Sequence, residues 1–338
     1  MDALLFALNA IVPIVLLILV GYFLKKKSFL PENWFQLGNK LIFKICLPCL
    51  LFVNVYNIES FAAIDWSVVV YAEAAILLFA LFAFLFAKYA IPVDRQKGVI
   101  MQCVFRSNFA IIGLPLAESL GGPEGVGIAA VLSAFSIPTF NILAVIALTV
   151  FLKDENAKKA DFKAILIKIA KNPLILGVLA GLLALGVRSI LPVNAAGLPV
   201  FSLKEDLAFL FSAVSQLSKM CGPLSLIVLG GLFQFGAVKK LAKPIAIGTV
   251  LRLVVVPVVA IGGAILLSRF TAWVQFDAPV YPALLALFAS PVAVSSAIMA
   301  QEMDNDGTLA GQLVMWTSVF SILTLFIYIL LLKNIGLL

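Results

Sequence analysis

Long apolar stretches alternate with short polar ones along nearly the whole chain. A helix needs about 20 mostly apolar residues to cross the hydrocarbon core of a bilayer. The pattern predicts ten transmembrane helices, at residues 4–24, 37–56, 66–89, 98–119, 124–152, 165–190, 206–235, 243–268, 279–302 and 308–332. The first stretch is long enough to span and has no basic flank before it, so we expect a membrane helix there rather than a signal peptide. The sequence therefore predicts an all-α integral membrane protein.

Composition agrees with this pattern and narrows the function. Of the 338 residues, 63% are hydrophobic and 12% are charged, whereas soluble domains are about 45–50% apolar and about 25% charged. Histidine is absent, which removes the commonest metal ligand and the usual base of a catalytic triad. The sequence has no P-loop, G-x-S-x-G or H-E-x-x-H motif. We therefore expect no enzyme, no metal, no cofactor, and transport driven by a gradient rather than by ATP.

Basic residues gather in every second loop, after the first, third, fifth and seventh predicted helices. They are Lys25, Lys26, Lys27, Lys88, Arg95, Lys97, Lys153, Lys158, Lys159, Lys163, Lys239, Lys240 and Lys243. By the positive-inside rule these loops face the cytoplasm, and both termini lie outside. The topology accounts for the net charge of +7 without a nucleic-acid partner. We expect a multi-pass protein of the cell (inner) membrane.

Three short patterns recur in the same order in the two halves of the chain. "KICLP" at 44–48 returns as "KMCGP" at 219–223, and Pro115 has a counterpart in Pro291. "PIVLLILVG" at 13–21 in the first predicted helix also resembles "PLILGVLAG" at 173–181 in the sixth. Such recurrence indicates an internal repeat.

The repeat divides the chain into a first half at 1–152, a cytoplasmic linker at 153–164 and a second half at 165–338. Each half has five predicted helices. Because five is odd, the second half must insert upside down. Inverted repeats of this kind are an architecture of secondary transporters, whose binding site lies near mid-membrane between the halves.

The matched prolines are expected to break the fourth and ninth helices. Pro115 leaves the carbonyl of Ile111 without its helical donor, and Pro291 does the same to Leu287. Gly113 loosens the first break further. Unpaired backbone at membrane depth is tolerated only against protein or a wet cavity. Two helices broken opposite each other would direct N-terminal ends at one point and favour an anion there.

Polar residues flank both prolines, including Ser107 and Ser296. A plain kink is the alternative for either proline alone, but a matched pair with polar flanks favours a binding site. The expected substrate-binding residues are Asn108, Gly113, Pro115, Ser290, Pro291, Val294 and Ser295.

Five charged residues lie well inside the predicted spans: Lys44, Glu73, Arg106, Lys219 and Arg252. Such residues are costly in the membrane and usually face an aqueous path or a partner. Four of the five are basic, which biases the interior toward anions. For Lys44 and Arg252 the alternative is snorkelling of the side chain to the headgroups. Glu73 is too short for that, so it either pairs with a basic residue or changes protonation during transport.

The first cysteine pair has the spacing of a redox dithiol, Cys46-Leu47-Pro48-Cys49. Its repeat partner at 219–223 keeps the lysine, the first cysteine and the proline but not the second cysteine. We therefore favour a proline-broken helical turn with a charged residue at the break, because Pro48 frees the carbonyl of Lys44. Redox chemistry is the disfavoured alternative.

The fourth helix carries the most specific motif. "NFAIIGLPL" at 108–116 fits N-x-x-x-x-G-x-P-L and is followed by Gly122. With "KICLP" at 44–48 and "ASPVAVSSAIMAQEMDND" at 289–306, it resembles the auxin efflux carrier family, bacterial membrane transport proteins related to plant PIN carriers. The resemblance covers essentially the whole chain.

The resemblance implies ten helices, of which the first, second, sixth and seventh form a scaffold. The third to fifth and eighth to tenth form a moving transport domain, with the two broken helices crossing at their prolines. It implies that Asn108 binds substrate and that Lys44 and Glu73 belong to a polar support site. Asn141 is the nearest candidate for a further polar support residue in the fifth helix, and Arg106 and Lys219 are available as cationic groups.

The expected function is secondary active transport of a small organic anion by an elevator mechanism. A malate- or malonate-like dicarboxylate is the first choice, with a proton or sodium as the coupling ion. One alternative is efflux of an aromatic, auxin-like carboxylic acid. Another is an anion channel, or a membrane sensor that binds a ligand without moving it. A homodimer through the scaffold helices is also compatible with the resemblance.

Overall fold

The computed structural model describes residues 2–57, 66–152, 171–192, 200–233, 235–270 and 276–338. These residues form helices and connecting turns, and the extended pairing they contain is one isolated antiparallel bridge. Among them, seven helical stretches are long and apolar enough to cross a membrane: Glu32–Tyr56, Trp66–Ala90, Phe109–Val150, Pro173–Ile190, Ala208–Leu232, Val238–Phe270 and Gly307–Asn334. The all-α membrane class is confirmed.

The elements follow the expected order. The first half has α1 (Asp2–Lys26), α2 (Glu32–Leu41), η1 (Ile42–Cys46), α3 (Leu47–Tyr56), α4 (Trp66–Ala90), α5 (Asp94–Phe105), η2 (Phe109–Gly113) and α6 (Leu114–Val150). The second has α8 (Pro173–Ile190), α9 (Ala208–Leu232), η3 (Phe235–Ala237), α10 (Val238–Val250), η4 (Leu251–Val255), α11 (Val256–Phe270), α12 (Val280–Ala289), α13 (Ser295–Glu302) and α14 (Gly307–Asn334). The linker at 153–164 lies outside the described residues.

Three differences from the predicted spans have local causes. The second span begins earlier, at Glu32, because Pro31 is extended and an acidic first turn suits a helix N-terminus. α6 contains a corner at Gly122, whose φ of 57° is open to glycine, and this corner separates the fourth from the fifth predicted span. The fourth and ninth spans are not single helices, since α5 and α12 each end at mid-span.

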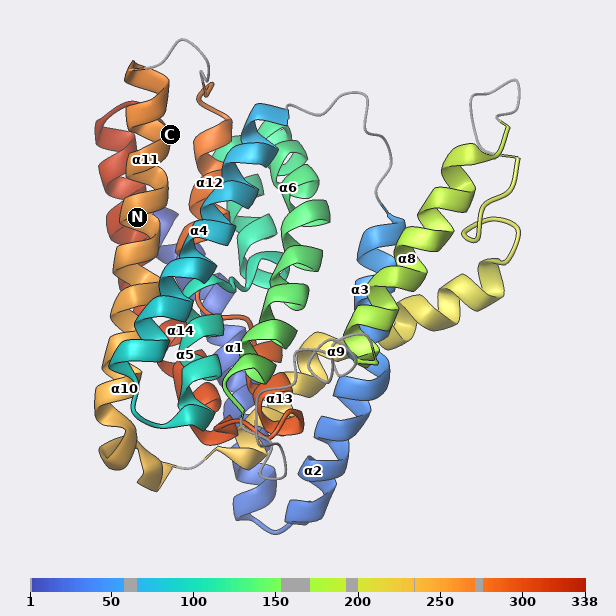
Figure 1. Ribbon diagram of the computed structural model, residues 1–338, viewed down its shortest axis with the longest axis vertical. Helices are drawn as coiled ribbons and strands as arrows, with labels where there is room; N and C mark the ends of the chain where they lie inside the picture. The colour runs from blue at the N-terminus through green and yellow to red at the C-terminus, as the bar shows by residue number, and fades with distance from the viewer. Residues whose placement is uncertain (1, 58–65, 153–170, 193–199, 234, 271–275) are drawn as a thin grey trace.

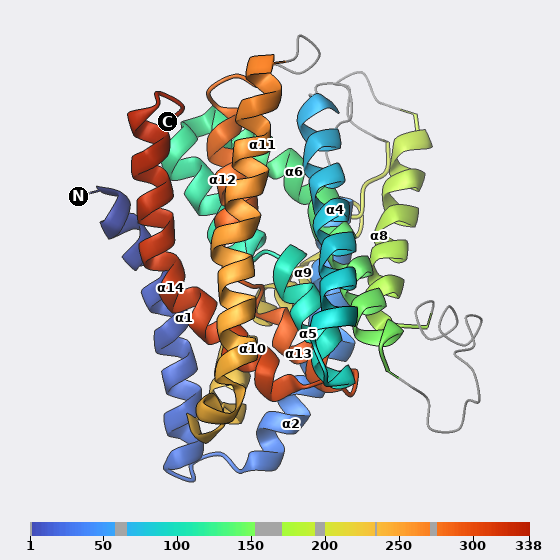
Figure 2. The same ribbon diagram turned by 60° about the vertical axis from the view of Figure 1, so that its left-hand side comes forward.

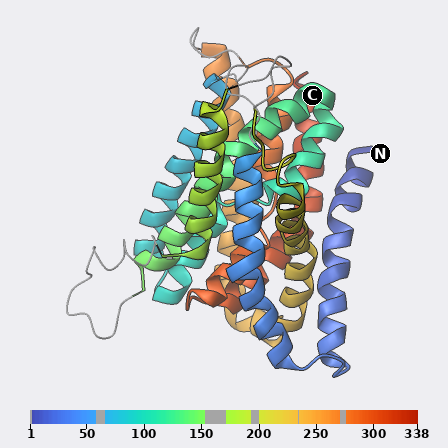
Figure 3. The ribbon, with the colours of Figure 1, turned by 90° about the vertical axis from the view of Figure 1, so that its right-hand side faces the viewer.

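Of the predicted proline breaks, the one at Pro291 is present, since α12 ends at Ala289, but those at Pro48 and Pro115 are not. The π-helical turns η1, η2 and η4 each end two residues before a proline, at Pro48, Pro115 and Pro257. A widened turn accommodates the missing N–H and the pyrrolidine ring without ending the helix. The predicted break at Pro48 is therefore wrong, because Lys44 lies in a continuous rod formed by α2, η1 and α3 (Figure 3).

Two groups of helices face each other in the molecule. α3, α8 and α9 lie on one side, and α4, α5, α6, α10, α11 and α12 form a bundle on the other (Figure 1). α1 packs along both α9 and α14, and it runs beside α14 in Figure 2. α8 packs along α3. The crossing segments described below lie within the bundle and face the first group.

Glycines set how closely the first group packs. A Cβ added at Gly21 of α1 would overlap the carbonyl of Ile227, and one added at Gly230 of α9 would overlap the carbonyl of Ile18. In the same way, Gly181 of α8 lies against Val55 of α3. Small residues let helix backbones approach closely in a membrane, where packing drives helix association.

We expect Gly230→Ala to lower stability by about 1–3 kcal/mol, because the new methyl group must push α9 away from α1. Gly262→Ala in α11 is the matched control, since an added Cβ there meets nothing within 4 Å; it should be neutral or slightly stabilising. Thermal unfolding in detergent measures both, and equal melting temperatures would contradict the close contact.

Candidate functional site

The two interrupted spans cross through backbone pairing. Past the end of α5, Arg106 is extended, and Ser107 forms an antiparallel bridge with Val292. The N–H of Asn108 donates to the carbonyl oxygen of Pro291 at 2.8 Å. The expected crossing is present, but the first break lies at residues 106–108 and not at Pro115. The reason is that the N–H of Asn108 is diverted to the other chain segment, which ends the helical ladder there.

A cavity of about 520 Å³ opens beside this crossing. Its walls come from both halves of the chain: α1, α3, η2 and α6 from the first, and α9 and residues 293–295 from the second. Six of the expected site residues line it: Arg106, Asn108, Asn141, Lys219, Val294 and Ser295. The volume suits a small molecule.

Arg106 is the buried charge of the cavity. Its side chain is 3% exposed. One guanidinium nitrogen, Nη2, donates to Asn141 Oδ1 at 2.6 Å and to Ser295 Oγ at 2.9 Å. The other, Nη1, contacts Gln102 Oε1 and Met299 Sδ. Within the described part of the chain, all of these partners are neutral, and no carboxylate pairs with Arg106.

Some buried polar groups in the lining of the same cavity have no hydrogen-bond partner. Asn108 Nδ2 and Ser107 Oγ are buried and have no partner, although the two residues are only 4% and 5% exposed. Asn54 Nδ2, on the opposite wall of the cavity, is also unpartnered. Buried polar groups normally find a partner. Two unpartnered amide donors in a cavity whose guanidinium has no carboxylate partner among the described residues suit a bound carboxylate.

The remaining lining is apolar or cationic. The charged lining residues described are Arg106 and Lys219, and Lys219 is exposed. The apolar wall includes Leu47, Leu50, Leu51, Leu114, Ile137 and Phe140.

Four expected binding residues do not line the cavity: Gly113, Pro115, Ser290 and Pro291. Pro291 accepts the hydrogen bond from Asn108. Ser290 Oγ donates to the carbonyl of Ala286. A Cβ added at Gly113 would come within 3.0 Å of the same carbonyl, so this glycine lets η2 approach α12. Pro115 is exposed and does not line the cavity.

The expected support residues are divided. Asn141 holds Arg106, as described above. Glu73 accepts a hydrogen bond from Ser136 Oγ at 3.0 Å, and Ser136 directly precedes the cavity-lining residue Ile137. Lys44 is exposed on η1 and is not brought to the cavity. The matching lysine of the second copy, Lys219, does line the cavity, together with Cys221 and Pro223, whereas the first copy contributes Leu47.

The cysteine motif does not form a disulfide. Cys46 and Cys49 are both free, the first buried and the second half-buried. Cys221 lines the cavity. Sequence reasoning missed Asn54, although a lone asparagine in the apolar run "LLFVNVY" was a visible signal.

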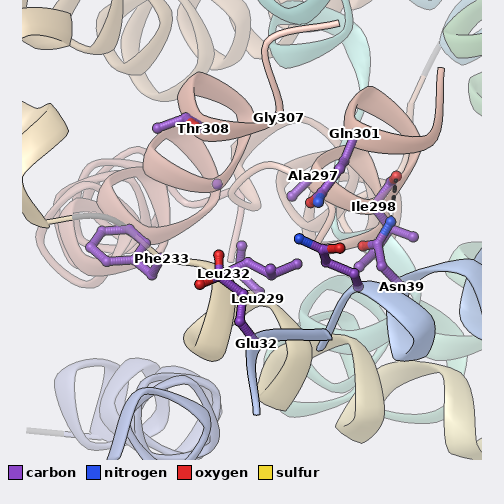
Figure 4. Close-up of a pocket in the computed structure, with 12 residues that line it drawn as sticks. Glu32, Asn39, Leu229, Leu232, Phe233, Ala297, Ile298, Gln301, Gly307 and Thr308 are labelled. Atoms are coloured by element: carbon purple, nitrogen blue, oxygen red, sulfur yellow. Dashed lines mark hydrogen bonds between the residues drawn. The ribbon is translucent and has the colours of Figure 1, made fainter. Parts of the chain in front are cut away.

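A second, smaller cavity of about 230 Å³ lies farther along the same helices (Figure 4). One wall of this cavity is formed by α2 and the C-terminal end of α9. The opposite wall is formed by α13 and α14. Asn39, which is 0% exposed, crosses between the walls. Its Nδ2 donates to Glu302 Oε1 at 2.7 Å and lies 3.4 Å from the carbonyl oxygen of Ile298.

Comparison with known proteins assigns the chain to a protein family. Residues 6–329 match the family described as Membrane transport protein. The chain is also similar to the "Uncharacterized transporter MJ1031" of Methanocaldococcus jannaschii, with 23% identity over 322 residues that cover 94% of this chain and 96% of that protein. The resemblance drawn from the fourth-helix motif is thereby confirmed. The chain belongs to the Membrane transport protein family, the family of the auxin efflux carriers, and is a multi-pass membrane transport protein.

Proposed function

We propose that the chain is a secondary transporter of small organic anions, and that the cavity at the crossing binds the anion. The observation that carries this proposal is Arg106, a buried guanidinium without a carboxylate partner among the described residues. An unpaired charge is costly away from water. A substrate carboxylate accepting from Arg106 and from Asn108 Nδ2 would supply the missing partner.

A malate- or malonate-like dicarboxylate is the substrate class that fits the charges best. The second cation of the cavity, Lys219, offers a partner for a second carboxylate. The leucine-rich wall supports a different candidate, an aromatic carboxylic acid whose ring would pack there while its carboxylate met Arg106. The two candidates share one carboxylate contact and differ in the other end of the ligand.

The proposed architecture is a pair of inverted five-helix repeats at 1–152 and 165–338. Packing supports it: α1 lies along α9, and α8, which would correspond to α1, lies along α3. The breaks after α5 and after α12 occupy matching places in the two halves. Both termini outside and a cell-membrane location remain predictions from the basic loops.

The proposed mechanism is elevator-type alternating access. In it α1, α2–α3, α8 and α9 stay fixed, while the bundle that carries the crossing moves. The hydrogen bond from Asn39 to Glu302 joins α2 to α13 across the two groups at the predicted cytoplasmic end. That contact would have to break for the cavity to open to the cytoplasm. Glu73 and Asn141 belong to the moving part in this scheme.

Asn108→Ala in proteoliposomes should lower uptake of the true substrate about 10- to 100-fold, because a hydrogen bond to a charged group is lost. Radiolabelled malonate is the first probe. Asn334→Ala, at an exposed position, is the matched control and should transport normally. Uptake by Asn108→Ala at the rate of the unaltered protein would contradict the assignment of Asn108 as a substrate-binding residue. Uptake against a gradient that collapses with a protonophore would separate a coupled transporter from a channel or sensor.

Arg106→Gln should raise the Kd for malonate about 10- to 100-fold, since the buried positive charge is removed. Calorimetry on the purified protein measures the change, with indole-3-acetate as the competing ligand. Tighter binding of indole-3-acetate than of malonate by the unaltered protein would favour the aromatic candidate. Unchanged affinity for every acid in Arg106→Gln would exclude the proposed carboxylate contact.

Glu302→Ala should shift the protein away from the state described here, because it removes a hydrogen bond to a charged group between α2 and α13. The readout is a reporter chain with Ala110→Cys, an exposed cavity position, and serine at the native cysteines Cys46, Cys49, Cys103 and Cys221. A membrane-impermeant maleimide added from the side opposite the Asn39–Glu302 contact should label the reporter about three- to tenfold more slowly after Glu302→Ala, because the cavity then opens toward the cytoplasm.

Glu205→Ala, an exposed carboxylate on the chain before α9, serves as the control and should leave the labelling rate unchanged. An unchanged rate in Glu302→Ala as well would argue against a latch at this end.

A further inference from the structure

Arg252 is a second buried guanidinium near the crossing, with surroundings unlike those of Arg106. It lies in η4, and its side chain is 0% exposed. The sequence left open that Arg252 snorkels to the headgroups. Because the side chain is fully buried, that alternative is wrong. In the described residues it forms no ion pair, and it does not line either of the cavities above.

Its partners are three backbone carbonyls that the helix breaks leave free. Nη1 donates to Val104 at 3.0 Å, Nη2 to Leu287 at 3.3 Å and Nε to Ser290 at 2.9 Å. In an unbroken helix the carbonyl of Val104 would accept from Asn108, but that N–H bonds to Pro291 instead. The carbonyl of Leu287 lacks a donor because Pro291 has no N–H.

These carbonyls belong to the C-terminal ends of α5 and α12. A helix C-terminus carries a partial negative charge and its N-terminus a partial positive one. At the crossing, two C-terminal ends therefore meet two N-terminal ends, those of η2 with α6 and of α13. Left alone, the C-terminal ends would oppose a bound anion as much as the N-terminal ends favour it.

We propose that Arg252 is a positioning and charge-balancing residue of the anion site. It ties the carbonyl ends of α5 and α12 together, neutralises their partial negative charge, and so leaves the crossing with a net preference for anions. The consequence for substrate rests on the proposed function, but the charge preference of the cavity is a property that can be measured without any substrate.

The experiment uses the reporter chain with Ala110→Cys and two methanethiosulfonate reagents, which react with thiols in the same way but carry opposite charges. The anionic reagent carries an ethylsulfonate group and the cationic reagent an ethyltrimethylammonium group. The measured quantity is the ratio of the anionic to the cationic rate, divided by the same ratio for free cysteine. Arg252→Gln should lower this ratio about tenfold, and Arg252→Lys, which keeps the charge, should stay within about twofold of the reporter chain. Arg269→Gln, at an exposed position of α11, is the matched control.

An Arg252→Gln ratio equal to that of the reporter chain overturns the proposal. A fall of similar size in Arg252→Lys also overturns it, because geometry rather than charge would then be responsible. Should Arg252→Gln fail to fold, Arg252→Lys decides alone: a ratio within twofold of the reporter chain supports the proposal, and a ratio equal to that of free cysteine refutes it. A chain that fails to move malonate but shows the tenfold fall would lose the proposed function and keep this inference.

Discussion

In the hydrocarbon core no water is present to satisfy backbone groups, so the two helix breaks persist only because the protein supplies partners for them. The N–H of Asn108 bonds to the carbonyl of Pro291, and Arg252 takes the carbonyls that both breaks release. With those groups satisfied, a short non-helical segment is stable at mid-span. Its side chains, Ser107 and Asn108 among them, can then line a cavity instead of one face of a helix.

The two buried arginines differ in their hydrogen-bond partners and in their electrostatic roles. Arg252 is saturated by carbonyl oxygens, whereas Arg106 is held by neutral side chains and faces the cavity. Among the described residues no carboxylate pairs with Arg106, so its positive field reaches the cavity. The cavity thus combines a fixed cation, unpartnered amide donors and an apolar wall, and the proposed organic-anion site rests on this combination.

Close packing and continuous helices frame this site. Gly21 and Gly230 bring α1 against α9, so that these two helices form a firm wall opposite the crossing. The π-helical turns before Pro48, Pro115 and Pro257 keep the long helices unbroken. Proline therefore widens a turn at Pro48, Pro115 and Pro257 without ending the helix, whereas α12 ends at Pro291 and α5 ends where the N–H of Asn108 bonds to another segment.

Apolar length and local motifs were enough to predict the membrane class, the succession of helical segments, the family and a candidate site at the crossing, because each depends on residues that are near one another in the sequence. The sequence also identified Asn108, Arg106 and Asn141, which share the cavity. Helix packing, by contrast, leaves Lys44 exposed outside the cavity, places Asn54 in its lining and buries Arg252. The sequence alone could not show this, because the surroundings of a side chain depend on which helices pack beside it. The position of the first break could not be predicted from the sequence either. The break at residues 106–108 depends on a hydrogen bond to the carbonyl of Pro291, which is distant along the chain.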